Sequence, residues 1–100
     1  MDPGYEELFE LEEIYKAFGS VPRLRILIRL REGEASAGEL SEVSGLSQSA
    51  ASHQLKELKL RRIIKSRKDG LNIFYSLQDA HIISMMENGL EHIRKVHCGE

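Results

Sequence analysis

The segment Leu46–Leu60, with the sequence LSQSAASHQLKELKL, divides into two faces when it is drawn as a helix. One face is apolar and carries Ala51, Leu55 and Leu58. The opposite face is polar and consists of Gln48, Ser49, Ser52, His53, Lys56 and Lys59. Short side chains that donate and accept hydrogen bonds let a helix approach bases and phosphates closely. The segment therefore predicts either a helix that contacts DNA, with Ser47 and Lys56 among the contacting residues, or an ordinary surface helix with Ser47 as its N-cap.

A short helix and a tight turn are predicted immediately before this segment. Ser36 and Glu39 have the spacing of a capping box at a helix start, and Leu40 and Val43 would face the core. Gly45 then marks the turn into the next helix. Two helices joined by a short glycine-containing turn, the second with a polar face, are typical of a helix-turn-helix.

Two β-rich runs follow, and they predict a hairpin. They cover residues 63–67 and 71–77, and the Lys-Asp-Gly sequence at 68–70 between them contains the Asp-Gly pair that is typical of a hairpin turn. We expect Ile73 and Tyr75 to help close the core. A helix-turn-helix followed by a hairpin is the layout of a winged helix, so the fold class is mainly α with a β-hairpin (α+β).

Charge is distributed unevenly along the chain. The formal net charge of −2 alone argues mildly against a nucleic-acid partner. Residues 56–68 nevertheless hold only one acidic side chain beside a block of basic ones: Lys56, Lys59, Arg61, Arg62, Lys65, Arg67 and Lys68. Such a block is an electrostatic footprint of nucleic-acid binding, although a solvated surface is the simpler interpretation. On a winged helix, Arg67 and Lys68 at the hairpin would contact the DNA backbone beside the major groove.

Size and composition indicate one globular domain over residues 1–100. The chain is 41% hydrophobic and 30% charged, which excludes a disordered protein. Its single cysteine, Cys98, leaves no internal disulfide and fits a reducing compartment. The N-terminus is acidic where a signal peptide would be basic, and no apolar run is long enough to span a membrane. We expect a cytoplasmic protein with no membrane partner.

Long helices with apolar faces are predicted at both ends of the chain. The first begins at Pro3 and Gly4 and ends at Gly19, and a second runs from Ser20 to Glu32. The first helix has a wide apolar face of Tyr5, Leu8, Phe9, Leu11, Tyr15 and Phe18. The last helix, residues 78–96, has a stripe of Ile82, Met86, Leu90 and Ile93. These faces would form either core or a dimer contact.

The last helix also carries side chains that can bind a metal. Asp79 and His81 lie at its start, but His92 follows eleven residues later, about 16 Å along one helix. Two copies packed antiparallel about a two-fold axis would bring His81 of one chain opposite His92 of the other. A simpler interpretation makes Asp79 a helix cap and the histidines half-exposed polar residues.

With these motifs, the chain resembles the ArsR/SmtB family of metal-sensing repressors over nearly its full length. LSQSAASHQLKELK resembles the recognition-helix signature of the family, and FYSLQDAH followed by His92 resembles the motif of members that bind zinc or cobalt on their last helices. The resemblance implies a homodimer joined through its first and last helices. It also implies DNA contacts at Gln48, Ser49, Ser52 and His53, and metal ligands at Asp79, His81 and His92.

One position departs from the family pattern. The fourth ligand of the family falls at Lys95, and a protonated lysine cannot bind a metal. His97 is the nearest substitute, but it lies about 200° further round the helix and would need the last turn to fray or bend. Water or Cys98 are the other candidates. No cysteine precedes Cys98, so the cysteine-containing site of other members is absent.

These patterns predict a repressor that binds an inverted-repeat operator in double-stranded DNA and is released by a divalent metal. Zinc is the expected regulatory ion because the ligands are nitrogen and oxygen, with cobalt or nickel as alternatives. A second hypothesis keeps the DNA-binding dimer but gives it another signal or none. A third, a small metallohydrolase, is disfavoured because no pocket, oxyanion donor or general base accompanies the ligands. We therefore expect neither an enzyme nor a small-molecule substrate.

Overall fold

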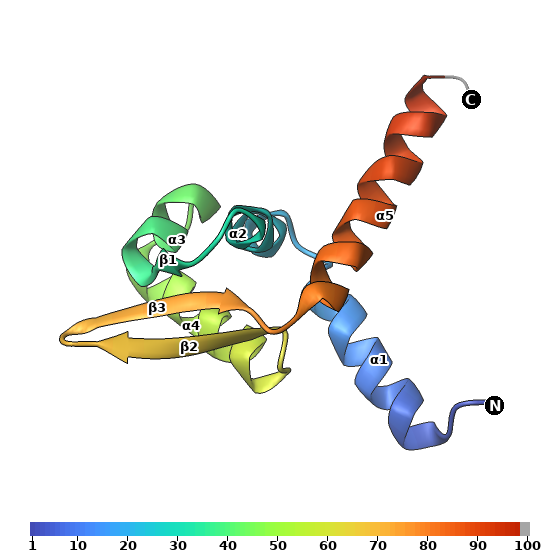
Figure 1. Ribbon diagram of the computed structural model, residues 1–100, viewed down its shortest axis with the longest axis horizontal. Coiled ribbons are helices and arrows are strands. Elements are labelled where there is room, and N and C mark those ends of the chain that lie inside the picture. The colour runs from blue at the N-terminus through green and yellow to red at the C-terminus, as the bar shows by residue number, and fades with distance from the viewer. Residues whose placement is uncertain (99–100) are drawn as a thin grey trace.

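Five helices and a three-stranded antiparallel sheet make up the part of the chain that the computed structural model describes, residues 1–98 (Figure 1). In chain order the elements are α1 (Tyr5–Ala17), α2 (Val21–Arg31), β1 (Ala35–Ser36), α3 (Ala37–Ser44), α4 (Gln48–Leu60), β2 (Ile64–Asp69), β3 (Asn72–Leu77) and α5 (Ala80–His97). Helices α3 and α4 form the helix-turn-helix, and the hairpin of β2 and β3 forms the wing. The predicted winged helix-turn-helix fold is confirmed.

Local capping residues fix the start of α3, the turn after it and the start of α4. The Ser36 hydroxyl accepts a hydrogen bond from the Glu39 amide at 3.2 Å, and the Glu39 carboxylate accepts one from the Ser36 amide at 3.1 Å. This is the predicted capping box. Gly45 ends α3 in the left-handed conformation, with φ of 77°. Ser47 then caps α4 by accepting a hydrogen bond from the Ala50 amide at 3.2 Å.

Replacing Gly45 with alanine will destabilise the domain. A side chain in the left-handed region costs about 1 kcal/mol, or about 4–8 °C in the melting temperature of a domain of this size. No atom lies within 4 Å of the added Cβ, so the cost is backbone strain alone. The matched control is Gly38→Ala in α3, which is expected to stabilise by up to about 0.5–1 kcal/mol. Thermal unfolding at one fixed protein concentration measures both, and equal melting temperatures for the two variants would contradict this account.

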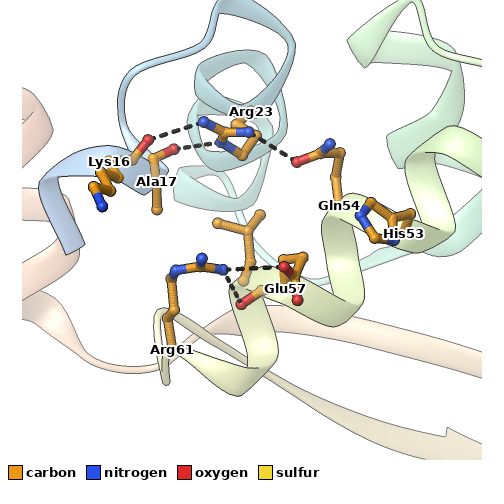
Figure 2. A pocket seen from close by; sticks show the side chains of 8 residues that line it. Lys16, Ala17, Arg23, His53, Gln54, Glu57 and Arg61 are labelled. Atoms are coloured by element: carbon orange, nitrogen blue, oxygen red, sulfur yellow. Dashed lines mark hydrogen bonds and ion pairs between the residues drawn. The ribbon is translucent and has the colours of Figure 1, made fainter. Parts of the chain in front are cut away.

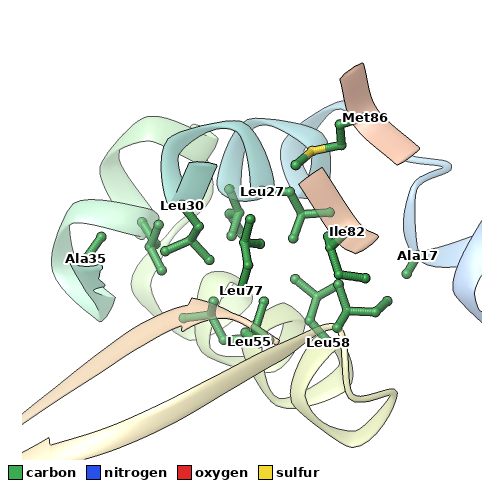
Figure 3. Packing of buried hydrophobic residues seen from close by; sticks show 13 residues of the cluster. Ala17, Leu27, Leu30, Ala35, Leu55, Leu58, Leu77, Ile82 and Met86 are labelled. Carbon is green, nitrogen blue, oxygen red and sulfur yellow. The ribbon is translucent and has the colours of Figure 1, made fainter. Parts of the chain in front are cut away.

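The core lies where α2, α3, α4, the sheet and the first half of α5 meet (Figure 3). From the predicted apolar stripe of α5, Ile82 and Met86 are buried in this core. The predicted inner face of α4 is confirmed, because Ala51, Leu55 and Leu58 are all buried. Two expected core residues are exposed instead, Val43 and Ile73. On α3 the buried face consists of Leu40, Ser41 and Ser44, which turns Val43 outward. Ile73 lies on the same side of β3 as the buried Leu77. It is nearer the hairpin tip, however, where the hairpin projects away from the helices (Figure 1).

The sheet has the order β1-β3-β2. Strand β1 consists of two residues and pairs Ala35 with Tyr75, a pairing that the sequence analysis missed. In the hairpin, Asp69 pairs with Asn72, which leaves Gly70 and Leu71 as the turn. The predicted turn at 68–70 is therefore displaced toward the C-terminus, because Lys68 and Asp69 still belong to β2.

Helices α1 and α5 project from the end of the domain opposite the hairpin tip (Figure 1). Helix α1 ends at Ala17 rather than Gly19, and Ala17 is its only buried residue. Exposed apolar side chains line α1, namely Tyr5, Leu8, Phe9, Leu11 and Tyr15. Helix α5 begins at Ala80, two residues later than predicted, and also exposes Ile93 and Val96. No helix within residues 1–98 has both the length and the apolar character needed to cross a membrane.

Candidate nucleic-acid interface and metal centre

The polar face of α4 is exposed along its whole length. It presents the side chains that the sequence analysis placed on this face: Gln48, Ser49, Ser52, His53, Lys56 and Lys59. Because Ala51, Leu55 and Leu58 hold the opposite side in the core, the polar face is presented on a rigid element. Ser47 differs from the others, since its hydroxyl already caps the helix and lies 3.5 Å from that of Ser49. Helix α4 therefore presents a continuous row of short polar side chains to solvent.

Arg67 connects the wing to the segment before β1. Its guanidinium donates two hydrogen bonds of 2.7 Å to the Glu34 carboxylate and lies 4.9 Å from the centre of the Phe74 ring. Bidentate arginine–carboxylate pairs are among the stronger polar contacts in proteins. Arg67 was predicted to contact the DNA backbone, and in the described chain it is bound to Glu34. Lys68, the other predicted wing contact, is exposed.

The pair of Glu34 and Arg67 has a measurable pH signature. The hydrogen bonds from Arg67 hold the pKa of the Glu34 carboxyl below its ordinary value of 4.5. A depressed carboxyl pKa contributes stability above pH 4.5 that is lost as the pH falls through the folded-state pKa. We expect an NMR titration of the Glu34 carboxyl to show the depressed pKa, and Arg67→Gln to move that pKa up toward 4.5. An unchanged pKa in Arg67→Gln would contradict the assignment of this contact.

The basic block of residues 56–68 divides into two groups. Arg61 and Arg67 are bound to carboxylates, Arg61 to Glu13 at 3.3 Å and to Glu57 at 3.7 Å. The other five have no ion pair within residues 1–98 and are exposed: Lys56, Lys59, Arg62, Lys65 and Lys68. The positive charge available to a polyanion is therefore supplied by the second group.

Asp79 and His81 come together at the start of α5. Asp79 caps the helix by accepting a hydrogen bond from the His81 amide at 2.9 Å, so the cap interpretation is confirmed. The same carboxylate oxygen lies 3.1 Å from His81 Nδ1, and both side chains are exposed. Two ligands of one tetrahedral zinc ion are about 3.3 Å apart, given metal–ligand distances near 2.0 Å. The 3.1 Å distance is that of a hydrogen bond between the two side chains, and it also leaves an oxygen and a nitrogen donor close enough together to bind one zinc ion.

The other candidate ligands lie too far along α5 to join this pair within one chain. His92 is three turns further along the helix, and no group of three metal-binding side chains comes together within residues 1–98. Helix α5 is regular through His97, so the frayed last turn that His97 would need is not present. Lys95, at the position of the family's fourth ligand, is exposed. A complete site thus requires a donor from outside the chain. The donor set of Asp79, His81 and His92 meets this requirement if Asp79 and His81 come from one chain and His92 from a second copy.

A pocket beside the polar face of α4 contains Arg23, a residue that the sequence did not single out (Figure 2). In it, Arg23 donates hydrogen bonds to the carbonyl oxygens of Lys16 and Ala17, each at 2.9 Å, and to Gln54 Oε1 at 3.0 Å. Arg23 stands in the second helix with no local pattern that distinguishes it from its neighbours. Only the tertiary structure shows that it contacts both α1 and α4.

These elements define a winged helix-turn-helix protein. The second helix of its helix-turn-helix, α4, has an exposed polar face, and its last helix, α5, carries a carboxylate–imidazole pair. Residues 20–66 match the sequence profile described as "Bacterial regulatory protein, arsR family". The chain belongs to this family. It is 33% identical to the cadmium resistance transcriptional regulatory protein CadC homolog of Staphylococcus aureus, over 95% of this chain and 79% of that protein.

Two further similarities agree with this assignment. The chain is 31% identical to the transcriptional repressor SmtB homolog of Synechocystis sp., over 86% of this chain and 65% of that protein, so it spans about two thirds of this relative's length. The crystal structure of the antimony-specific transcriptional repressor AntR superimposes with a TM-score of 0.80 at 32% identity, covering 94% of this chain and 86% of that one. The resemblance to transcriptional regulators of the ArsR family is confirmed.

Proposed function

We propose that this protein is a homodimeric transcriptional repressor that binds an inverted-repeat operator and releases it when a divalent metal binds. The observation that carries the proposal is the placement of three metal-binding side chains on α5. Asp79 and His81 are adjacent, whereas His92 is out of their reach on the same helix. A second copy of α5, packed antiparallel, completes the site. Metal binding then depends on how the two chains of the dimer are arranged.

The dimer is supported by the exposed apolar faces of α1 and α5. Large apolar side chains on both helices are exposed in the single chain, including Tyr5, Phe9 and Ile93. Between α1, α2 and α5 lies an apolar groove of about 280 Å³, whose lining includes Tyr15 and Leu90. Apolar surface of this extent on a small domain favours burial against a partner. A second copy is the partner that a two-fold metal site requires.

DNA binding is supported by the recognition helix α4 and the free lysines around it. In a winged helix, this helix enters the major groove and its short polar side chains contact base edges. Lys56 and Lys68 are exposed and would contact phosphates on either side. A two-fold dimer would then bind half-sites about 34–36 Å apart, one helical turn of DNA.

Zinc is the metal that the donor set supports best. Each of two equivalent sites would contain Asp79 and His81 of one chain and His92 of the partner subunit, with solvent as the remaining ligand. Imidazole and carboxylate donors suit zinc, with cobalt and nickel as alternatives. A bound cation would favour one arrangement of the paired α5 helices. Coupling of this kind typically changes ligand affinity by about 1–3 kcal/mol. Similarity to AntR, whose name records antimony specificity, and to a cadmium resistance regulator supports metal responsiveness in general.

The proposal is tested by fluorescence anisotropy of labelled DNA. Duplexes bound by the protein are first selected from a randomised library, and their affinity is then measured without metal and with zinc, cobalt or nickel. We expect zinc to weaken binding by roughly 5–150-fold, and a salt titration to show a phosphate-dependent slope. Selection of no duplex would refute DNA binding, whereas DNA binding with no response to any metal would refute the sensor.

One observation favours a second candidate function, a DNA-binding dimer with no metal response. Lys95 is exposed one turn from His92 and places a positive charge near the proposed site. Equilibrium dialysis with zinc separates the two candidates. Two zinc ions bound per dimer support the sensor, and no zinc bound supports the second candidate.

A further inference from the structure

Helix α1 is connected to the recognition helix α4 by the side chain of Arg23. Three separate donors of its guanidinium are used, two on the carbonyl oxygens of Lys16 and Ala17 and one on Gln54 Oε1 (Figure 2). Those carbonyl groups are at the C-terminal end of α1, where the helix dipole favours a positive charge. Gln54 lies in the middle of α4, beside the exposed His53. One planar group therefore joins the end of α1 to the centre of the recognition helix.

A second arginine makes a parallel connection further along α4. Arg61, the residue after α4, contacts the Glu13 carboxylate of α1 at 3.3 Å and donates a hydrogen bond to the Glu57 carbonyl oxygen at 3.2 Å. Arg61 and Glu13 are both about three-quarters buried, which shields their contact from solvent more than a surface pair. Arg23 and Arg61 thus hold α1 against α4 at two separate points.

Few other contacts fix the direction of α1. Ala17, at its C-terminal end, is its only buried residue, and most of the helix is exposed in the single chain. Figure 1 shows α1 projecting away from the core. A helix attached mainly at one end can pivot unless other contacts fix its angle. The guanidinium contacts of Arg23 and Arg61 supply that restraint.

We propose that Arg23, assisted by Arg61, sets the angle between α1 and α4 and thereby determines which half-site spacing the dimer accepts. This inference rests on the proposed DNA-binding homodimer. If α1 forms part of the dimer contact, its angle to α4 sets the distance between the two recognition helices. One base pair more or less between half-sites shifts them by about 3.4 Å along the DNA. A dimer with a fixed angle rejects such a shift, and one with a pivoting α1 tolerates it.

The test compares the spacing preferences of variants in which one arginine is replaced. Arg23→Gln removes the three contacts, and Arg25→Gln is the matched control, because Arg25 is an exposed residue of α2 with no side-chain hydrogen bond or ion pair inside residues 1–98. Duplexes are selected from a randomised library with each full-length protein. Affinities are then measured for the wild-type site and for versions with one base pair added or removed between half-sites.

We expect wild type and Arg25→Gln to select one spacing and to bind the altered sites much more weakly. Arg23→Gln should select the same half-site sequence with several spacings, and its discrimination between spacings should fall about tenfold. A merely structural role for Arg23 would weaken binding to all three sites equally. Unchanged discrimination in a dimeric, folded Arg23→Gln protein overturns the inference.

Two milder variants keep the test decisive if Arg23→Gln does not fold. Gln54→Ala removes only the contact of Arg23 with α4. Glu13→Gln weakens the contact of Arg61 with α1 and, within α1 itself, the ion pair of Glu13 with Lys16. Each variant should discriminate less between half-site spacings while it still forms dimers and binds zinc as wild type does. The inference is overturned if both variants discriminate between spacings as well as wild type. Failure of wild type to select DNA, or a monomer in sedimentation, instead removes the proposed function on which the inference rests.

Discussion

Alanine at His81 or at His92 will abolish the response to metal and leave the DNA affinity of the metal-free protein unchanged. Each substitution removes one of the three protein ligands that we propose, and even the loss of a hydrogen bond to a ligand weakens metal binding by about 10–100-fold. We therefore expect zinc affinity to fall by at least about 100-fold. Both side chains are exposed and lie on α5, away from α4, so the fold and the DNA-binding face should be retained. Zinc affinity by competition with a chelating dye, and DNA affinity by anisotropy, measure the two effects.

The matched control is His53→Ala, which removes another exposed imidazole from a different helix. This variant should bind zinc as wild type does. Equal loss of zinc affinity in His53→Ala would indicate nonspecific binding by surface histidines. Wild-type zinc sensitivity in either α5 variant would refute the assignment of that ligand.

Substitutions on the recognition helix should have the opposite pattern. Ser52→Ala and His53→Ala are each expected to weaken operator binding by about 1–3 kcal/mol, or roughly 5–150-fold, because each removes a side chain that we propose contacts a base edge or a phosphate. Zinc affinity should not change. Anisotropy with the selected operator at one fixed salt concentration measures the loss.

Ser84→Ala is the control for Ser52→Ala, since Ser84 is an exposed serine on α5. It removes the same hydroxyl group far from the proposed groove contact. Normal operator affinity in both α4 variants would mean that this face does not contact DNA. A loss in Ser84→Ala as large as that in Ser52→Ala would show that the effect does not depend on the position of the serine.

The parts of the fold set by local interactions were predictable from sequence. Ser36 and Gly45 mark the two ends of α3, and Ser47 marks the start of α4, because capping and left-handed turns depend on residues within one turn of the chain. The alternating β-rich runs likewise predicted the hairpin. Arg62 is a local feature that was missed. It adopts φ of 58° after α4, a position where glycine or asparagine is usual, so nothing in its identity indicated the turn.

Contacts between distant segments were not predictable. Arg23 meets Gln54, which is 31 positions away, and Arg67 meets Glu34, which is 33 positions away. Many arginines and carboxylates in the chain have equivalent local surroundings, so sequence alone does not select these pairs. The same limit explains why the sequence did not indicate the pairing of Arg67 with Glu34. The contact of Arg67 with the DNA backbone stays a prediction. For the metal site, the sequence identified the cap pair of Asp79 and His81, whose contact is local.

The most direct test of the shared metal site is to mix the His81→Ala and His92→Ala proteins under conditions that allow subunit exchange. Each variant alone has no complete site. In a mixed dimer, the chain with intact His81 meets the intact His92 of the partner subunit, so one of the two sites is restored. Random exchange makes about half of the dimers mixed. We predict that tight zinc binding returns on mixing, at about one ion per mixed dimer, and that the mixture again responds to zinc in the DNA assay. A mixture that binds no more zinc than the separate variants would contradict the account.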